Sequence, residues 1–160
     1  MNLDLVINFL SADHDLCIGY SGITFLKVEE LNKGQIGYSR NEDGNSFIDG
    51  QEGYWREEWL VIGQDELLGD PIFVDTKSEA LTVFSAIHGE GKWEPYIVAH
   101  SFSNFINIIE HLKIISENRE NPVALESNPL SIHESEQFLY NIKHNNPFAD
   151  IQYWKGFLEE

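Results

Sequence analysis

The chain has 160 residues, and its 27 acidic residues against 10 basic ones give a formal net charge of −17 at pH 7. This length predicts one domain, with or without an appendage, that can fold without disulfides. Its single cysteine, Cys17, excludes an internal disulfide and a multi-cysteine zinc site. Such negative charge disfavours nucleic acid and anionic lipid as partners and favours a basic protein.

No apolar run reaches the roughly 18 residues that a membrane helix needs, so we expect no membrane partner. The first residues also lack the basic segment of a signal peptide. A lone cysteine suits a reducing compartment. The sequence therefore predicts a cytoplasmic protein.

The first third of the chain predicts short elements around one long loop. Apolar residues at helical spacing predict a helix over residues 2–11, and residues 16–18 and 23–26 read as extended segments. Residues 28–34 predict one or two helical turns closed by Gly34. Residues 39–58 are polar and glycine-rich, which indicates a long surface loop.

Residues 59–99 carry the strongest strand signal in the chain. Four short apolar runs, at residues 59–62, 71–74, 80–84 and 96–99, alternate with turn residues. Connections this short cannot make parallel crossovers, so we expect a four-stranded antiparallel meander. Trp59 and Trp93 lie near its two ends and are large enough to anchor a core.

The remaining chain predicts helices. Ser101 caps an amphipathic helix that runs to about Asn118. Residues 119–130 contain two prolines and are expected to be a linker. Ser131 and Glu134 form a capping box at the start of another helix, and a short helix ends the chain. We expect a domain over residues 1–118 and a helical extension over residues 119–160 packed on it.

Acidic residues concentrate between positions 41 and 75, where Arg56 is the only basic residue. One interpretation is a docking surface for a basic protein. The alternative is a solvated edge on which Asp70 and Asp75 cap turns. A hard-cation site is a weaker third reading, because the sequence has no calcium-binding loop motif.

The aromatic pair Tyr54 and Trp55 beside Arg56 has the composition of an interface hot spot. The alternative is that Trp55 packs beneath the loop. Together with the acidic residues, the pair defines the candidate partner-binding set: Glu52, Tyr54, Trp55, Glu57, Glu58, Asp65, Glu66 and Asp70.

His88 is the one histidine with a catalytic interpretation, as an acid–base group in a glycine-rich turn near Asp75 or Glu94. The sequence has no nucleophile elbow, dinucleotide fingerprint or phosphate loop beside it. A histidine in a tight turn more often bonds to backbone. We therefore assign no catalytic residue, no metal ligand and no cofactor, and expect Cys17 to be a core thiol.

Residues 20–112 resemble the SUKH superfamily, the proteins similar to the yeast cell-wall-synthesis regulator. The matching residues are Trp59, Ile62-Gly63, Gly69 to Phe73, Asp75, His88-Gly89, Trp93 to Pro95 and Ser101-Phe102. The resemblance implies an α+β fold, with a curved antiparallel sheet and helices packed on one side. The longer N-terminal helical segment of the family is absent, and residues 122–160 extend beyond the match.

The resemblance also implies a function, since bacterial members mostly act as immunity proteins that bind and neutralise a cognate toxin. We therefore predict a non-enzymatic antitoxin whose acidic surface binds a basic toxin of the nuclease class. The extension could serve as a second partner surface or a homodimer element. The alternatives are a ligand-binding or regulatory scaffold with a pocket on the sheet, and an enzyme that uses His88 with Asp75.

Overall fold

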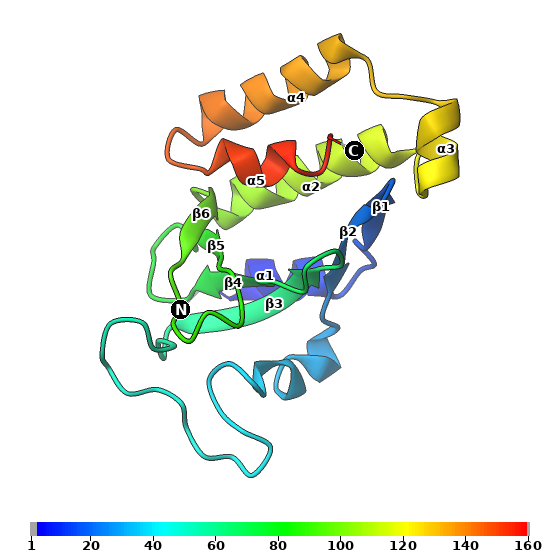
Figure 1. The fold of residues 1–160 in the computed structure, drawn as a ribbon. Helices are drawn as coiled ribbons and strands as arrows, with labels where there is room; N and C mark the ends of the chain where they lie inside the picture. The colour runs from blue at the N-terminus through cyan, green and yellow to red at the C-terminus, as the bar shows by residue number, and fades with distance from the viewer. Residues whose placement is uncertain (1–2, 160) are drawn as a thin grey trace.

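The computed structural model describes residues 3–159 and shows an α+β fold built on one curled, six-stranded antiparallel sheet (Figure 1). The strands follow one another in chain order across the sheet. They are β1 (Leu16–Ile18), β2 (Ser21–Phe25), β3 (Trp59–Asp65), β4 (Pro71–Asp75), β5 (Val83–Ser85) and β6 (Tyr96–Ala99). The predicted meander is confirmed, and β1 and β2 extend it by two strands.

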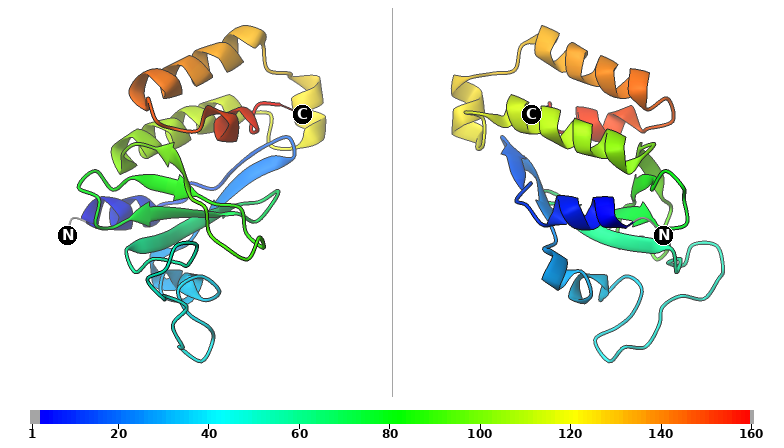
Figure 2. Two further views of the ribbon diagram at one scale, coloured as in Figure 1. Left: turned by 60° about the vertical axis from the view of Figure 1, so that its left-hand side comes forward. Right: turned by 180° about the vertical axis from the view of Figure 1, so that it is seen from behind.

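Helices gather on one side of the sheet, as Figure 2 shows from two further directions. They are α1 (Asp4–Leu10), α2 (Phe102–Ser116), α3 (Pro122–Ser127), α4 (Ile132–Asn145) and α5 (Ile151–Lys155). Two short 3-10 helices, η1 (Val28–Glu30) and η2 (Lys33–Gln35), follow β2. Among the described residues, no helix has the length and apolar character to cross a membrane.

The two faces of the sheet bury different residues because side chains alternate along a strand. Leu60 and Ile62 of β3 join the large core beneath the helices, which also includes Phe105 of α2. Trp59 and Val61 point to the opposite face. On that face Trp59 belongs to the aromatic cluster and Val61 packs against it. We define this cluster as Tyr38, Trp55, Trp59, Phe73, Phe84 and Trp93.

The C-terminal helices contact the outer side of β6. The indole N–H of Trp154 donates to the carbonyl of Val98 at 2.7 Å, and the amide of Asp150 donates to the carbonyl of Ile97 at 2.7 Å. Asn146 accepts a bond from the amide of His100 at 2.8 Å. Residues 146–154 therefore bond directly to the last strand of the sheet.

Arg119 joins the end of α2 to the later helices. Its buried guanidinium donates to the carbonyls of Ile115 and Asn128, at 2.9 and 2.8 Å, and to Glu134 at 3.1 Å. Each of these acceptors lies in a different segment. One side chain therefore fixes the path of the chain from α2 through α3 to α4.

Three local predictions are wrong. The expected linker at 119–130 contains α3, because Pro122 occupies its first helical position, where a proline loses no hydrogen bond. Gly34 lies inside η2 and does not close a helix. The strand expected at 80–84 begins at Val83, since Leu81 has a positive φ of 54° that no strand residue adopts. The helix predicted over 2–11 is α1, and residue 2 lies outside the described residues.

Candidate functional site

The long loop after η2 covers the aromatic cluster and exposes most of its polar residues. Trp55 is only 1 % exposed, and its indole N–H donates to the carbonyl of Trp59 at 3.1 Å. The amide of Trp93 donates to the carbonyl of Gly53 at 2.8 Å, which ties the loop to the turn between β5 and β6. The loop is thus held at its centre by buried contacts, although it has almost no regular structure.

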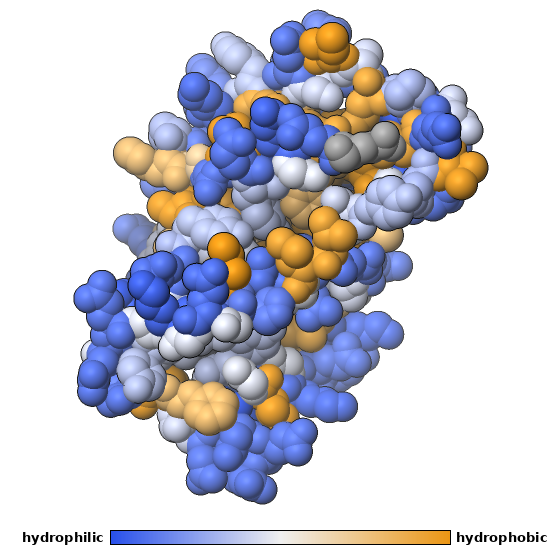
Figure 3. All heavy atoms as spheres, in the orientation of Figure 1, coloured by the Kyte–Doolittle hydropathy of each residue, from blue (hydrophilic) through white to orange (hydrophobic). Residues whose placement is uncertain are grey.

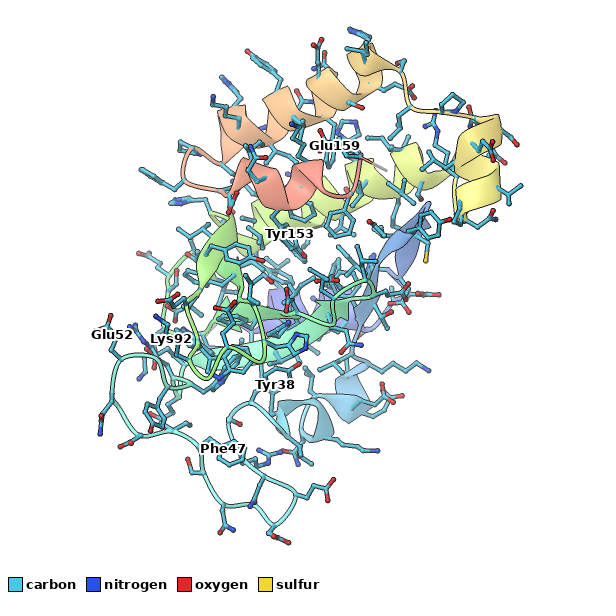
Figure 4. All side chains as sticks on the ribbon, in the orientation of Figure 1. Tyr38, Phe47, Glu52, Lys92, Tyr153 and Glu159 are labelled. Carbon is cyan, nitrogen blue, oxygen red and sulfur yellow. The ribbon has the colours of Figure 1, made fainter. Side chains whose placement is uncertain are left out.

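We define the acidic loop face as the exposed side chains of residues 41–58 and 88–94. Three of them are large and apolar or aromatic: Phe47, Ile48 and Tyr54. The exposed carboxylates of this face are Glu42, Asp43, Asp49, Glu52 and Glu57 from the loop, and Glu90 and Glu94 from the turn between β5 and β6. Figure 4 shows Phe47 and Glu52 on this loop, which lies on the side of the sheet away from the helices. An apolar centre with a charged rim is the usual anatomy of a protein–protein interface.

A cleft of about 490 Å³ opens within this face. Side chains of Tyr38, Phe47, Tyr54 and Trp93 line it, together with backbone at Gly53 and Gly91. The cleft is large enough to receive side chains of a partner or a small ligand. It lies on the face of the sheet opposite the helices, next to the aromatic cluster.

Ion pairs neutralise only part of the acidic loop face. Lys92 lies 2.5 Å from Glu94, and Lys77 lies 3.4 Å from Glu58 and 3.8 Å from Glu57. The hydrogen bond to Glu94 and its charge raise the pKa of Lys92. Within residues 3–159, no basic group forms an ion pair with Glu42, Asp43, Asp49 or Glu52. These four carboxylates carry the uncompensated charge of the loop.

Arg56 does not neutralise that charge either. Its guanidinium lies over the ring of Trp59, 5.2 Å from the ring centre, in a cation–π contact. The predicted hot spot is therefore divided between two roles. Tyr54 is exposed and Trp55 is buried, so the prediction that Trp55 contacts a partner directly is wrong, and the alternative of packing beneath the loop is correct.

The structure does not bring all the predicted acidic residues together. Glu57 and Glu58 precede β3, whereas Asp65 is its last residue and Glu66 follows it, so the two pairs lie about 20 Å apart along the strand. Asp65 and Asp70 are buried. These residues do not form a single acidic surface, because the length of β3 separates the two pairs and because Asp65 and Asp70 are buried. The predicted set is Glu52, Glu57, Glu58, Asp65, Glu66 and Asp70.

Buried Asp65 and Asp70 order the turn between β3 and β4. The Oδ1 atom of Asp65 accepts the amide of Leu68 at 2.7 Å. Asp70 Oδ1 accepts both the amide of His88, at 2.9 Å, and its ring Nδ1, at 2.8 Å. The predicted pair of His88 with Asp75 is wrong, because Asp75 lies at the far end of β4 and caps the amides of Lys77 and Ser78 at 2.9 and 3.1 Å.

Glu66 bonds to neighbouring strands. Its carboxylate accepts from the hydroxyl of Thr24 at 2.5 Å and from the thiol of Cys17 at 3.3 Å. Partial burial, this hydrogen bond and the charge of Glu66 together raise the pKa of Cys17 to about 11. The thiolate population at neutral pH is therefore very small, and Cys17 is a poor nucleophile.

One feature was missed by sequence reasoning. Leu67, Leu68 and Ile87 are exposed beside a groove of about 270 Å³ whose lining is mostly apolar. Its lining residues are Ser21, Gly22, Asp65, Leu67, Leu68, Asp70, Ile87, Tyr96, Gln152, Tyr153, Gly156 and Phe157. The two adjacent leucines in a turn are the local signal of this groove in the sequence. Its other lining residues come from distant parts of the chain.

Comparison of the chain with protein-family models, with curated proteins and with solved structures finds no match. Over residues 3–159, the structure also contains no group of three or more histidine, cysteine or carboxylate side chains placed to hold a metal ion. The functional argument therefore depends on the surfaces of this molecule.

Proposed function

We propose that this chain is a non-enzymatic immunity protein that binds a basic toxin, of the nuclease class, through its acidic loop face. One observation carries the proposal: exposed Phe47, Ile48 and Tyr54 lie on a loop anchored by buried Trp55, and four carboxylates of that loop form no ion pair within the described residues. The net charge of −17 and the resemblance to the SUKH superfamily support the same conclusion.

The two kinds of side chain would act at different stages of binding. Uncompensated carboxylates attract a positively charged partner over long range and raise the association rate. Once the surfaces meet, exposed aromatic side chains desolvate against the partner and slow dissociation. A nuclease binds the phosphates of its substrate with basic residues. An acidic surface that binds those basic residues would block access of the substrate.

The test is a charge reversal on the acidic loop face, compared with one elsewhere. The first variant changes Glu42, Asp43, Asp49 and Glu52 to lysine. The matched control changes Glu110, Glu117, Glu126 and Glu136, which are exposed on or beside the helices, and therefore has the same net charge. Glu58 and Asp65 are left unchanged because the first is half-buried and the second is buried.

Association and dissociation rates are measured by surface plasmon resonance against the toxin domain captured with the chain from its source strain. The loop variant is expected to associate at least about tenfold more slowly and to lose most of its salt dependence. The control should retain the specific contacts, so its association rate and salt dependence should fall less than those of the loop variant. Equal effects of the two variants would show that only net charge matters and would refute the placement of the interface.

A ligand-binding scaffold is the second candidate, and the aromatic-lined cleft of about 490 Å³ favours it. A thermal-shift screen of small molecules distinguishes the two functions. A ligand present at 100 times its dissociation constant would stabilise the fold by about 2.7 kcal/mol. A hit abolished by Tyr54→Ala would assign the cleft to that ligand.

A further inference from the structure

The groove at the turn between β3 and β4 adjoins the acidic loop face only at His88, whose ring bonds to Asp70. Its rim consists of Leu67, Leu68 and Ile87, whose side chains are 61 %, 63 % and 52 % exposed. Figure 3 shows an apolar patch in this position, between the sheet and the helices above it. Large apolar side chains clustered on a surface mark an interaction site more often than scattered ones do.

The floor of the groove is polar. Asp65 and Asp70 line it and are 7 % and 3 % exposed. Among the described residues, the hydrogen bonds to these carboxylates all go to their Oδ1 atoms, which leaves one oxygen of each available. The lining includes no lysine or arginine, so two buried negative charges share the groove without a permanent cation.

Tyr153 adds an unsatisfied hydroxyl to the same groove. The hydroxyl oxygen is buried and has no hydrogen-bond partner among residues 3–159, although its ring packs against those of Tyr96 and Phe157. Figure 4 shows the side chain of Tyr153 directed from α5 toward the sheet. Burial raises the pKa of Tyr153 well above its usual value, and the charges of Asp65 and Asp70 add to the effect. A buried hydroxyl without a partner indicates a site that a ligand completes.

We propose that this groove is the docking site for an arginine side chain presented by a protein partner. The aliphatic stem lies against Leu67, Leu68 and Ile87. The guanidinium reaches the free oxygens of Asp65 and Asp70 and the hydroxyl of Tyr153. Charge complementarity selects this occupant, because an arginine has donors for all three acceptors.

Other side chains fit this groove less well. A leucine or phenylalanine would fill the apolar part but would cover two carboxylates without pairing them, which costs free energy. A lysine would pair with the carboxylates, yet its ammonium is compact and strongly hydrated. A guanidinium is planar and can also stack on the rings of Tyr96 and Tyr153. A volume of about 270 Å³ holds one long side chain and leaves room for little more.

This proposal does not depend on the function of the acidic loop face. The groove and the cleft of that face share no lining residue and lie near opposite ends of β3. A peptide experiment without any toxin tests the groove alone. Failure of one proposal therefore leaves the other standing.

The experiment titrates the complete 15N-labelled chain with the peptide acetyl-Gly-Leu-Arg-Leu-Gly-amide and follows amide shifts by NMR. A second peptide carries citrulline, the neutral isostere of arginine, at the central position. We expect saturable shifts at Leu68, Ile87 and Tyr153 with the arginine peptide. The citrulline peptide should bind at least about tenfold more weakly, since it forms no charged pair with the two carboxylates.

Two variants assign the contact. Leu68→Ser removes an exposed rim side chain and should weaken binding several-fold without unfolding the protein. Ile132→Ser, on exposed α4 and far from the groove, is the matched control and should bind like the unmodified chain. Equal affinity for the two peptides, absence of saturable shifts, or equal effects of the two variants would each overturn the proposal.

Discussion

The two faces of the sheet are covered in opposite ways. Helices cover one face, and their core is continuous from α1 to α5 and mixes aliphatic side chains with aromatic rings from α1, β2, α2, α4 and α5. An irregular loop covers the other, and six aromatic rings replace the missing secondary structure. The comparison shows that a few large rings can hold a polar loop in place. It also shows why the loop can carry surface charge, since buried Trp55 anchors it from beneath while its acidic side chains stay exposed.

The largest effect is expected on the helix-covered face. Phe105 is fully buried and packs against the rings of Phe9, Phe25 and Trp154. Phe105→Ala should lower the free energy of unfolding by about 3–5 kcal/mol, because it removes packing shared by α1, β2 and α5. Urea denaturation measures the change. Hydrogen exchange should accelerate across the whole sheet, and acceleration limited to α2 would contradict a single continuous core.

The loop-covered face should respond locally. Trp55→Ala is expected to cost about 3 kcal/mol, since the loop can partly collapse into the space that the ring leaves. Amides of residues 39–58 should lose their protection from hydrogen exchange, whereas those of β1 to β4 should keep most of theirs. Trp55→Phe is the milder control, because it retains a ring and loses the bond to Trp59, worth about 1 kcal/mol, together with part of the indole packing. An equal loss of hydrogen-exchange protection in the loop and in all strands would contradict a separate, locally stabilised loop-covered face.

Gly63 lies where the two faces are coupled, at the irregularity in the pairing of β3 with β4. A Cβ atom there would lie 2.6 Å from the backbone carbonyl oxygen of Thr24 and 3.0 Å from the ring of Phe25. Gly63→Ala should therefore destabilise the protein by about 2 kcal/mol, because a backbone atom of β2 cannot move aside easily. Thermal unfolding followed by circular dichroism provides the measurement. Gly156→Ala tests the alternative that any added methyl group is harmful, because its φ is −59° and its Cβ would come no closer than 3.3 Å to another atom.

Electrostatics should matter least, even where it links helices. The backbone N–H of Ser131 lowers the pKa of Glu134, and the Ser131 hydroxyl and Arg119 add to the shift. Because the pKa of Glu134 is lower in the folded state, its carboxylate stabilises the protein at pH values above the unfolded pKa of about 4.3. This stabilisation is lost as the pH falls through the folded-state pKa. Glu134→Gln should cost less than about 1 kcal/mol at pH 7, since the carboxylate is 41 % exposed.

The pH dependence provides the check on that last prediction. Urea denaturation at pH 7 and at pH 3 should show the difference between Glu134→Gln and the unmodified chain shrinking at the lower pH. A difference that stays constant would mean that glutamine disturbs packing and not charge. The same comparison on Glu136, which has no such contacts, should show no difference at either pH.

Sequence patterns predicted the parts of the fold that depend on neighbouring residues. The apolar runs at 59–62 and 71–74 identified β3 and β4, and Ser101 and Ser131 marked the starts of two helices correctly. Strands β1 and β2 were harder, because three to five residues give little periodicity. The helix α3 was hidden by two prolines, one of which occupies the position where a helix accepts it.

The surfaces were harder to predict than the elements. Glu57 and Asp65 are both acidic in the sequence. In the structure Glu57 is exposed in the loop before β3, whereas Asp65 is buried at the end of that strand. Trp55 was ambiguous for the same reason, since its burial depends on Phe73 and Trp93 from later segments. The groove at Leu68 needs Tyr153, which is 85 residues further along the chain. Such long-range contacts leave no mark in a local pattern.

The bonds from residues 146–154 to β6 also affect self-association. An open sheet ends in strands with free carbonyl and amide groups, which can pair with another copy of the chain and start aggregation. Here the indole of Trp154 and the amides at Asp150 and His100 already use the backbone positions on that side. A version shortened before Asn146 would present an unsatisfied strand and should form soluble oligomers or fibrils at concentrations where the complete chain stays dispersed.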